Sequence, residues 1–323
     1  MEKSSGLPYN AVLLWSPTSK CSLNCIYCIS SATMSEDKRK GKASLYNKIR
    51  MALKMSIPSL ARNFIIYKKM GGVVPIQTER LIRTLDATKK TFRIDFAGGE
   101  PFLIPNLVEA CAAITKKHFV SINTNLITGK IDEFAAKIDP ERVSFFVASL
   151  HIKELEKHGL MSKYIDNFLK CRNRGFKIFA REVSYPALFR EAEEYKAFFK
   201  EKGINLTFGP FAGQYNGRRY PQAYTDEELK VFGLPPSCKN RTDPAGKICN
   251  AGYNIAVVFP NGSVYPCYQM REYGETGNIY EKIKFTDKLI ECPFDSCNCP
   301  VDTCDPELAK KAIYERMGNM NEK

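Results

Sequence analysis

Three cysteines near the N-terminus are the residues best suited to chemistry. Cys21, Cys25 and Cys28 have the spacing C-x3-C-x2-C and follow an apolar run at residues 11–18. Three thiolates on one short loop can hold three irons of a [4Fe–4S] cluster and leave the fourth iron open to a ligand. A structural zinc site is the alternative, although zinc sites usually have a second, closing pair of cysteines.

A second motif follows the next apolar run, at residues 93–97. Gly98, Gly99, Glu100 and Pro101 are consecutive. Glycines let a ligand approach the backbone closely, and a carboxylate can accept hydrogen bonds from an ammonium group. Two glycines at the end of a strand can also form a plain turn. Because the cysteines also follow a strand, we interpret this motif as a binding element.

These two motifs resemble those of the radical S-adenosylmethionine (SAM) superfamily. Residues 21–28 are similar to the family's signature loop, in which an aromatic residue, here Tyr27, precedes the third cysteine. Residues 98–101 resemble the GGEP motif, which binds the methionyl amino group of SAM. The resemblance implies that the open iron chelates SAM, and that an electron from the cluster cleaves SAM to methionine and a 5′-deoxyadenosyl radical.

Polar residues end the later strands, at positions that resemble the family's contacts to the SAM ribose and carboxylate. They are Asn123 and Asn125 at the third strand, Ser149 at the fourth, and Arg181 with Glu182 on the fifth. Asparagine and serine supply hydrogen-bond donors and acceptors without charge. Each residue could equally be a structural hydrogen bonder.

The chain contains three histidines. His151 follows the fourth strand, so it could contact the SAM ribose or carboxylate, or face the substrate. His118 and His158 have no such placement, and we expect both to face solvent.

The C-terminal region contains seven further cysteines, from Cys238 to Cys304. Cys249 and the stretch from Gly262 to Cys267 resemble the opening of the SPASM and twitch domains, which carry an auxiliary [4Fe–4S] cluster. The later spacing, C-x4-C-x-C-x4-C, departs from the SPASM pattern and puts a second auxiliary cluster in doubt. The alternative is a zinc-binding module.

The resemblance implies at least one auxiliary cluster with four cysteine ligands. The ligand set that we prefer is Cys249, Cys267 and two of Cys297, Cys299 and Cys304. Cys238 is a further ligand or a thiol near the substrate, which could donate a hydrogen atom to a substrate radical. Cys111 and Cys171 lie in segments of helical pattern, and we expect them to be buried.

The order of the elements predicts an α/β fold. Apolar runs alternate with amphipathic stretches, as expected for parallel strands joined by crossover helices. Six such units predict a partial (β/α)6 TIM-like barrel over residues 1–232. Residues 233–323 form a small cysteine-rich domain with a hairpin about Asn261-Gly262. The runs are 11–18, 93–97, 119–124, 142–150, 177–183 and 205–209, and the stretches are 105–117, 131–138, 161–174 and 190–202.

A basic insertion occupies residues 34–78 of the barrel, and the formal net charge of the chain is +13. A basic amphipathic helix can contact an anionic membrane surface. The alternative is a helix packed on the barrel with a solvated basic face. No apolar run is long enough to span a membrane and no secretory signal is present, so we expect a cytoplasmic protein.

These observations predict an enzyme that abstracts a hydrogen atom from an unactivated carbon, leading to oxidation, epimerisation or bond formation. The resemblance implies a peptide, glycan or small-molecule substrate and a reductase such as flavodoxin or ferredoxin. Arg218 and Arg219 could bind an acidic or phosphorylated group of the substrate. The alternatives are an RNA-modifying enzyme of the same family and a non-catalytic electron carrier. No RNA-binding module is recognisable, so we predict no specific nucleic-acid partner.

Overall fold

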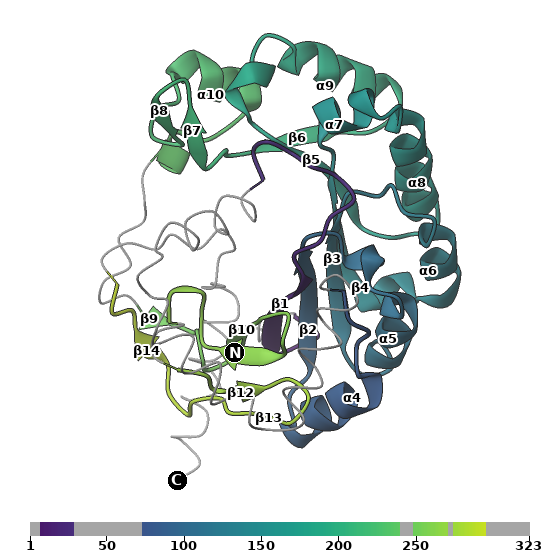
Figure 1. Cartoon of the computed structure of the whole chain (residues 1–323), viewed down its shortest axis with the longest axis vertical. Coiled ribbons are helices and arrows are strands. Elements are labelled where there is room, and N and C mark those ends of the chain that lie inside the picture. The colour runs from purple at the N-terminus through teal and green to yellow at the C-terminus, as the bar shows by residue number, and fades with distance from the viewer. Residues whose placement is uncertain (1–6, 29–72, 240–247, 271–273, 295–323) are drawn as a thin grey trace, which may run out of the picture.

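The computed structural model describes residues 7–28, 73–239, 248–270 and 274–294. Its centre is a curved sheet of six parallel strands that pair in chain order (Figure 1). The predicted strands are confirmed to within one residue at either end. The strands are β1 (Ala11–Thr18), β2 (Phe92–Gly98), β3 (Phe119–Thr124), β4 (Val143–Ser149), β5 (Ile178–Val183) and β6 (Leu206–Gly209).

Helices line the outer side of this curve (Figure 1). The four predicted helices are confirmed, with ends that differ by up to three residues, and α4 and α7 add to them. The helices are α4 (Thr78–Ala87), α5 (Leu107–Ile114), α6 (Ile131–Lys137), α7 (Ile152–Lys157), α8 (Met161–Asn173) and α9 (Ala192–Glu201). Short 3-10 turns lie at Pro101–Leu103, Pro140–Arg142 and Pro186–Leu188.

The main core lies between the outer face of the sheet and these helices. The ring of Phe134 on α6 lies 5.6 Å from that of Phe102 and 5.3 Å from that of Phe146, between ring centroids. Full burial of one such side chain contributes about 1.5–3 kcal/mol. Cys111 and Cys171 are also fully buried in this core, as expected.

The inner face of the sheet is filled at one end and open at the other. Arg93 on β2 donates two hydrogen bonds to Asp95, with N···O distances of 2.7 and 2.9 Å. The same guanidinium lies 5.0 Å from the ring centroid of Tyr9 and 5.2 Å from that of Phe145. This packed pair closes the inner face near the start of β2. Reactive groups therefore gather at the carboxyl ends of the strands, as in complete (β/α) barrels.

The C-terminal region continues the same sheet. Strand β10 (Ile255–Val258) pairs with β1 in parallel, on the side opposite to β2. Phe259 and Ser263 close the predicted hairpin at Asn261-Gly262, since the Phe259 N–H donates to the Ser263 carbonyl over 3.0 Å. One sheet therefore contains strands from both sides of the predicted boundary between residues 232 and 233. The further strands are β11 (Ser263–Tyr265), β12 (Gly277–Asn278), β13 (Lys282–Ile283) and a separate pair, β9 (Ile248–Cys249) with β14 (Ile290–Glu291).

A small hairpin and a helix follow β6. Strands β7 (Gly213–Tyr215) and β8 (Arg218–Tyr220) join at Asn216-Gly217, where both residues have positive φ, 47° and 73°. This backbone fits the Asn-Gly pair of a two-residue hairpin turn. Helix α10 (Asp226–Phe232) and the turn Pro236–Lys239 come next.

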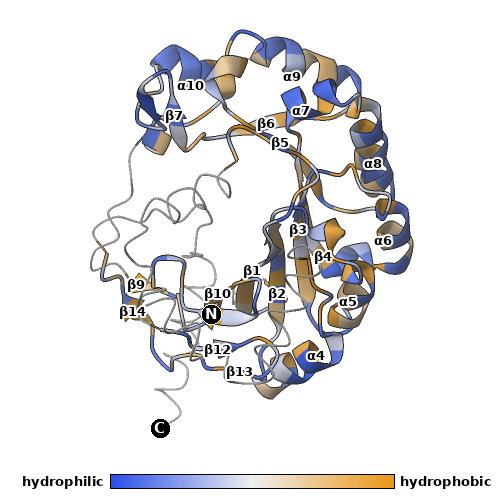
Figure 2. Cartoon of the chain, in the orientation of Figure 1, coloured by the Kyte–Doolittle hydropathy of each residue, from blue (hydrophilic) through white to orange (hydrophobic). Residues whose placement is uncertain are grey.

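Most of the predicted basic insertion at residues 34–78 lies outside the described residues. Among the helices that the structure describes, none is long and apolar enough to cross a membrane. The hydropathy colouring in Figure 2 agrees, because the helices carry hydrophilic residues on their outer sides.

The expectation that His118 faces solvent is wrong. Its side chain is buried between β2 and the end of α5, with 3% of its surface exposed. Its Nδ1 accepts a hydrogen bond from the Phe92 N–H over 3.3 Å, and the two rings meet edge to face. Burial lowers the pKa of His118 below its usual 6.5, because the charged form loses its hydration.

This burial predicts a pH-dependent stability. The unfolded chain binds a proton at His118 near pH 6.5, whereas the folded chain binds it only at lower pH. The free energy of unfolding should therefore fall as pH is lowered from about 7 to about 5. In His118→Leu this slope should become shallower, measured by urea unfolding with circular dichroism. His158→Gln, a change at an exposed histidine, is the matched control. An unchanged slope in His118→Leu would contradict the prediction.

Candidate active site

The three N-terminal cysteines lie on the segment from residue 19 to residue 28, which we call the cysteine loop. It follows β1 at the carboxyl end of the sheet. Cys25 is buried, Cys28 is half-buried and Cys21 is exposed. Burial raises the pKa of Cys25, and the neighbouring thiols of Cys21 and Cys28 raise it further. A buried thiol such as that of Cys25 ionises only beside a cation, which iron supplies.

The donor set of the loop fits a cluster with three cysteine ligands. The loop already bends tightly, because the Cys28 N–H donates to the Cys25 carbonyl over 3.1 Å. In the ranges that the structure describes, no three histidine, cysteine or acidic side chains are arranged to hold a single metal ion. The thiols of the loop would therefore turn toward each other when iron binds.

Gly98 and Gly99 form a shelf directly beneath this loop. The Gly99 N–H donates to the Thr18 carbonyl and the Glu100 N–H to the Lys20 carbonyl, both over 2.8 Å. A Cβ atom at Gly99 would lie 1.9 Å from the Lys20 carbonyl oxygen, and Gly98 has φ of +103°. Only glycine fits such a close approach between two backbones.

Glu100 is buried at the edge of the shelf, with 2% of its surface exposed. Its carboxylate accepts hydrogen bonds from the Thr124 hydroxyl and the Asn125 N–H, both over 2.8 Å, and from the Phe102 N–H over 3.0 Å. Burial raises the pKa of Glu100, and these donors lower it in part. The side chain thus joins β2 to the end of β3, and Pro101 begins the 3-10 turn behind it.

Asn125 reaches from the end of β3 to the first cysteine. Its side-chain N–H donates to the Ser22 hydroxyl over 3.0 Å and lies 3.8 Å from the Cys21 sulfur. Glu100 therefore holds the Asn125 backbone, and Asn125 in turn contacts the cysteine loop. The structure brings these two predicted residues together with Cys21.

Three further predicted residues line the open inner face. The Ser149 hydroxyl donates to the side-chain amide oxygen (Oδ1) of Asn123 over 2.6 Å, and Arg181 pairs with Ser149 in the register of β4 and β5. The Arg181 side chain lies over Gly209, where a Cβ would be 2.6 Å from its Nε. Within the described ranges the guanidinium has no hydrogen-bond or ionic partner. It is therefore available to an anionic ligand.

Glu182 lies on the opposite face of β5 from Arg181 and is fully buried. It accepts hydrogen bonds from the Tyr27 hydroxyl over 3.1 Å and from the backbone of Ile152 over 2.6 Å. Burial raises its pKa to about 7. The sequence placed Glu182 beside Arg181, but strand alternation directs it under the cysteine loop and away from the inner face.

His151 directly precedes α7 and has a left-handed backbone conformation, with φ of 51°. Its Nδ1 lies 3.4 Å from the Tyr27 hydroxyl, and burial lowers its pKa to about 4. The ring is therefore neutral near pH 7. Glu154, one turn along α7, accepts a hydrogen bond from the Asn24 N–H of the cysteine loop over 3.3 Å. Sequence reasoning missed this contact, since Glu154 lies among charged residues typical of an exposed helix.

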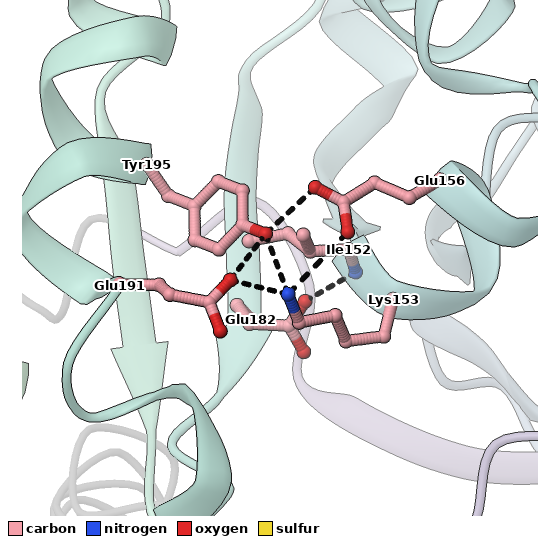
Figure 3. Close-up of polar contacts among 6 residues, drawn as sticks. All are labelled: Ile152, Lys153, Glu156, Glu182, Glu191 and Tyr195. Atoms are coloured by element: carbon pink, nitrogen blue, oxygen red, sulfur yellow. Dashed lines mark hydrogen bonds and ion pairs between the residues drawn. The ribbon is translucent and has the colours of Figure 1, made fainter.

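A network of polar side chains holds α7 in place (Figure 3). Ile152, at the start of α7, donates its N–H to Glu182, and the next residue, Lys153, pairs with Glu191 next to α9. The Tyr195 hydroxyl accepts from Lys153 over 2.8 Å and donates to Glu156 over 2.6 Å. Exposed pairs of this kind contribute about 0–1 kcal/mol each. Their effect is to fix α7 against α9.

Cys249 lies on β9, and Cys292 directly follows the partner strand β14. In the β9–β14 pair Cys249 is opposite Ile290, which comes two residues before Cys292. Cys267 is buried and follows Pro266, which contacts Gly252 beyond β9. The predicted ligands Cys297, Cys299 and Cys304 lie outside the described residues.

Cys238 lies elsewhere, on the turn after α10. It is half-buried, and burial raises its pKa. Its neighbour Tyr224 donates a hydrogen bond to the Ser184 carbonyl over 2.7 Å and packs on Tyr220 at 4.8 Å between ring centroids.

Comparison with known proteins agrees with this geometry. Residues 15–201 match the model of the radical SAM superfamily. Native anSMEcpe with bound AdoMet and Cp18Cys peptide has a similar structure, with 18% sequence identity and a TM-score of 0.52 over 83% of this chain and 77% of that chain. Streptococcus suis SuiB bound to S-adenosylmethionine is similar at 16% identity and a TM-score of 0.49, over 87% and 65%. At these identities the likeness is one of fold. No curated protein sequence matches the chain.

We predict that one methyl group added at Gly99, beneath the cysteine loop, strongly lowers the iron content. In Gly99→Ala the added Cβ would meet the Lys20 backbone at 1.9 Å, so the cysteine loop must move. We expect the variant to lose most of the iron that the wild type retains after anaerobic reconstitution. Gly129→Ala is the matched control, because a Cβ there meets nothing within 4 Å. Equal iron content in the two variants would show that the shelf does not position the loop.

Proposed function

The chain belongs to the radical SAM superfamily, and we propose that it cleaves SAM reductively in order to abstract a hydrogen atom from an unactivated carbon of a peptide substrate. The observation that carries this proposal is the cysteine loop seated on the Gly98–Gly99 shelf at the open end of the barrel. The loop supplies the three thiolates, and the shelf supplies backbone that a ligand can approach closely.

The family's cofactors are a [4Fe–4S] cluster and SAM. When bound, the reduced cluster supplies the electron that cleaves SAM to methionine and the 5′-deoxyadenosyl radical, which takes the hydrogen atom. Cys21, Cys25 and Cys28 would hold three of the irons. Gly98, Gly99, Glu100 and Pro101 would line the amino end of SAM, where Glu100 is already hydrogen-bonded by three protein donors.

The inner face of the sheet would hold the rest of SAM and the substrate. Asn123 and Ser149 already share a hydrogen bond there, which fixes their orientation before a ligand binds. Arg181, which has no ionic partner among the residues that the structure describes, offers its cation to a carboxylate. The packed Arg93–Asp95 pair closes the end of the barrel near the start of β2, and this keeps water from reaching the site from that side.

A peptide is the substrate class that we favour. The similar fold of anSMEcpe has been solved with AdoMet and a peptide bound, and the open inner face here presents Phe179, which is 56% exposed, beside Arg181. An aromatic ring next to a cation suits a peptide with an apolar and an acidic side chain. Arg218 and Arg219, both exposed on β8, would extend the contact to further acidic groups.

An auxiliary [4Fe–4S] cluster in the C-terminal region is the second part of the proposal. A common ligand group is supported by Cys249 on β9, by Cys292 directly after the partner strand β14, and by Cys267 directly after Pro266, which contacts Gly252. Cys297, Cys299 and Cys304 would complete it. Cys238 would then remain a thiol on the turn after α10, available as a hydrogen-atom donor, and a reductase such as flavodoxin or ferredoxin would supply electrons.

The central test is production of 5′-deoxyadenosine. Protein reconstituted without oxygen and given dithionite and SAM should release it, and Cys25→Ala should lose the activity at least 100-fold because one iron ligand is missing. Cys171→Ala is the matched control, since that thiol is buried in the core far along the chain from the loop. No product from wild-type protein with a verified [4Fe–4S] cluster would instead support an electron carrier.

Arg181 allows a separate test of cofactor or substrate binding. Removal of a charge-assisted hydrogen bond in Arg181→Met should weaken SAM binding about 10-fold or more if the guanidinium holds the SAM carboxylate. Gly209→Ala should act in the same direction, because its Cβ would displace the guanidinium. Equilibrium dialysis on reconstituted protein measures both, with Arg83→Met on the exposed side of α4 as control. Unchanged SAM affinity would assign Arg181 to the substrate.

A further inference from the structure

Tyr27 of the cysteine loop is fixed by the protein on all sides. Its hydroxyl donates to Glu182 over 3.1 Å and lies 3.4 Å from His151 Nδ1. Its ring lies 5.2 Å from that of Tyr185 and 6.0 Å from that of His151, between centroids. The hydroxyl therefore points into the barrel wall, and its hydrogen-bonding capacity is used there.

Glu182 is in turn fixed from two elements. One oxygen accepts from the Ile152 N–H at the start of α7 over 2.6 Å, and the other accepts from the Val183 N–H over 2.7 Å as well as from Tyr27. Within the described part of the chain no cation pairs with this carboxylate. Neutral donors alone offset its desolvation, so loss of any one of them is costly.

Glu154 makes a second contact to the same side of the loop. It accepts from the Asn24 N–H, the residue before Cys25, whereas Tyr27 is the residue before Cys28. Both carboxylates are carried by the corner of β4, α7 and β5, which the network of Figure 3 holds against α9. Two of the three cysteines are thus each preceded by a residue that a buried carboxylate binds.

We propose that Glu154 and Glu182 are positioning residues that clamp the Cys25–Cys28 half of the cysteine loop, and that the Tyr27 hydroxyl is the anchor of this clamp. The inference rests on the proposed function, in which these cysteines hold the cluster. Cys21 lies outside the clamp, because Asn125 contacts it from β3. Each half of the loop is therefore oriented by a different strand end.

If the clamp positions the loop, breaking it should change the properties of the bound cluster without releasing its iron. Tyr27→Phe keeps the ring contacts to Tyr185 and His151 but removes the hydrogen bond to Glu182. We expect wild-type iron content, an altered electron paramagnetic resonance (EPR) spectrum of the reduced cluster, and SAM binding weakened about 3- to 10-fold. Glu182→Gln should do the same, since an amide cannot accept from every donor around it.

The double variant separates a clamp from two independent effects. If Glu182 acts through Tyr27, then Tyr27→Phe combined with Glu182→Gln should weaken SAM binding by little more than Glu182→Gln alone. One control tests structure without the loop. Tyr164→Phe removes a buried hydroxyl that donates to the Ala148 carbonyl over 2.9 Å. It should lower the melting temperature slightly and leave the EPR spectrum unchanged.

The outcomes distinguish the clamp from the proposed function. Wild-type protein that forms 5′-deoxyadenosine, together with a Tyr27→Phe variant whose EPR spectrum and SAM affinity equal those of the wild type, would overturn the clamp alone. The clamp would also be overturned if the double variant weakened SAM binding by the product of the two single-variant factors. A wild-type cluster whose EPR spectrum does not respond to SAM would overturn both proposals.

Discussion

The geometry of the site depends on hydrogen bonds that buried carboxylates accept around the cysteine loop. Glu100 follows β2, Glu154 lies on α7 and Glu182 lies on β5. Together they bind the loop or the residues that contact it. Burying a carboxylate is costly unless donors replace its water. Each donor thus lowers the free energy of the folded state only while the loop stays in place, which couples the loop to three separate elements of the barrel.

The parallel sheet determines where these carboxylates can act. All six strands end at the same edge, so residues far apart in the chain, such as Gly99, Asn125 and Arg181, reach a common space there. Because successive side chains of a strand point to opposite faces, β5 contributes to two sides of the site. Arg181 faces the open interior, whereas Glu182, the next residue, supports the loop from behind. Two adjacent charged residues therefore serve different sides of one site.

The strands and the residues at their ends were predictable because the signals are local. Apolar runs end in Gly98-Gly99, in Asn123 and in Ser149, and the structure has these strands where the sequence predicts them. Long-range contacts were not predictable. The link from Tyr27 to Glu182 spans 155 residues, and nothing local to His118 distinguishes it from an exposed histidine. The turn at Asn216-Gly217 was also predictable, because an Asn-Gly pair is typical of a two-residue hairpin turn.

The pairing of β1 with β10 has a consequence for biosynthesis. Val12 lies opposite Ile255, so the strand that leads into the cysteine loop acquires its second neighbour only when about 240 further residues have been made. At ordinary elongation rates this takes tens of seconds. During that time one edge of an apolar strand is unpaired on the ribosome, where it can recruit other strands. The pairing of β10 with β1 then removes this edge.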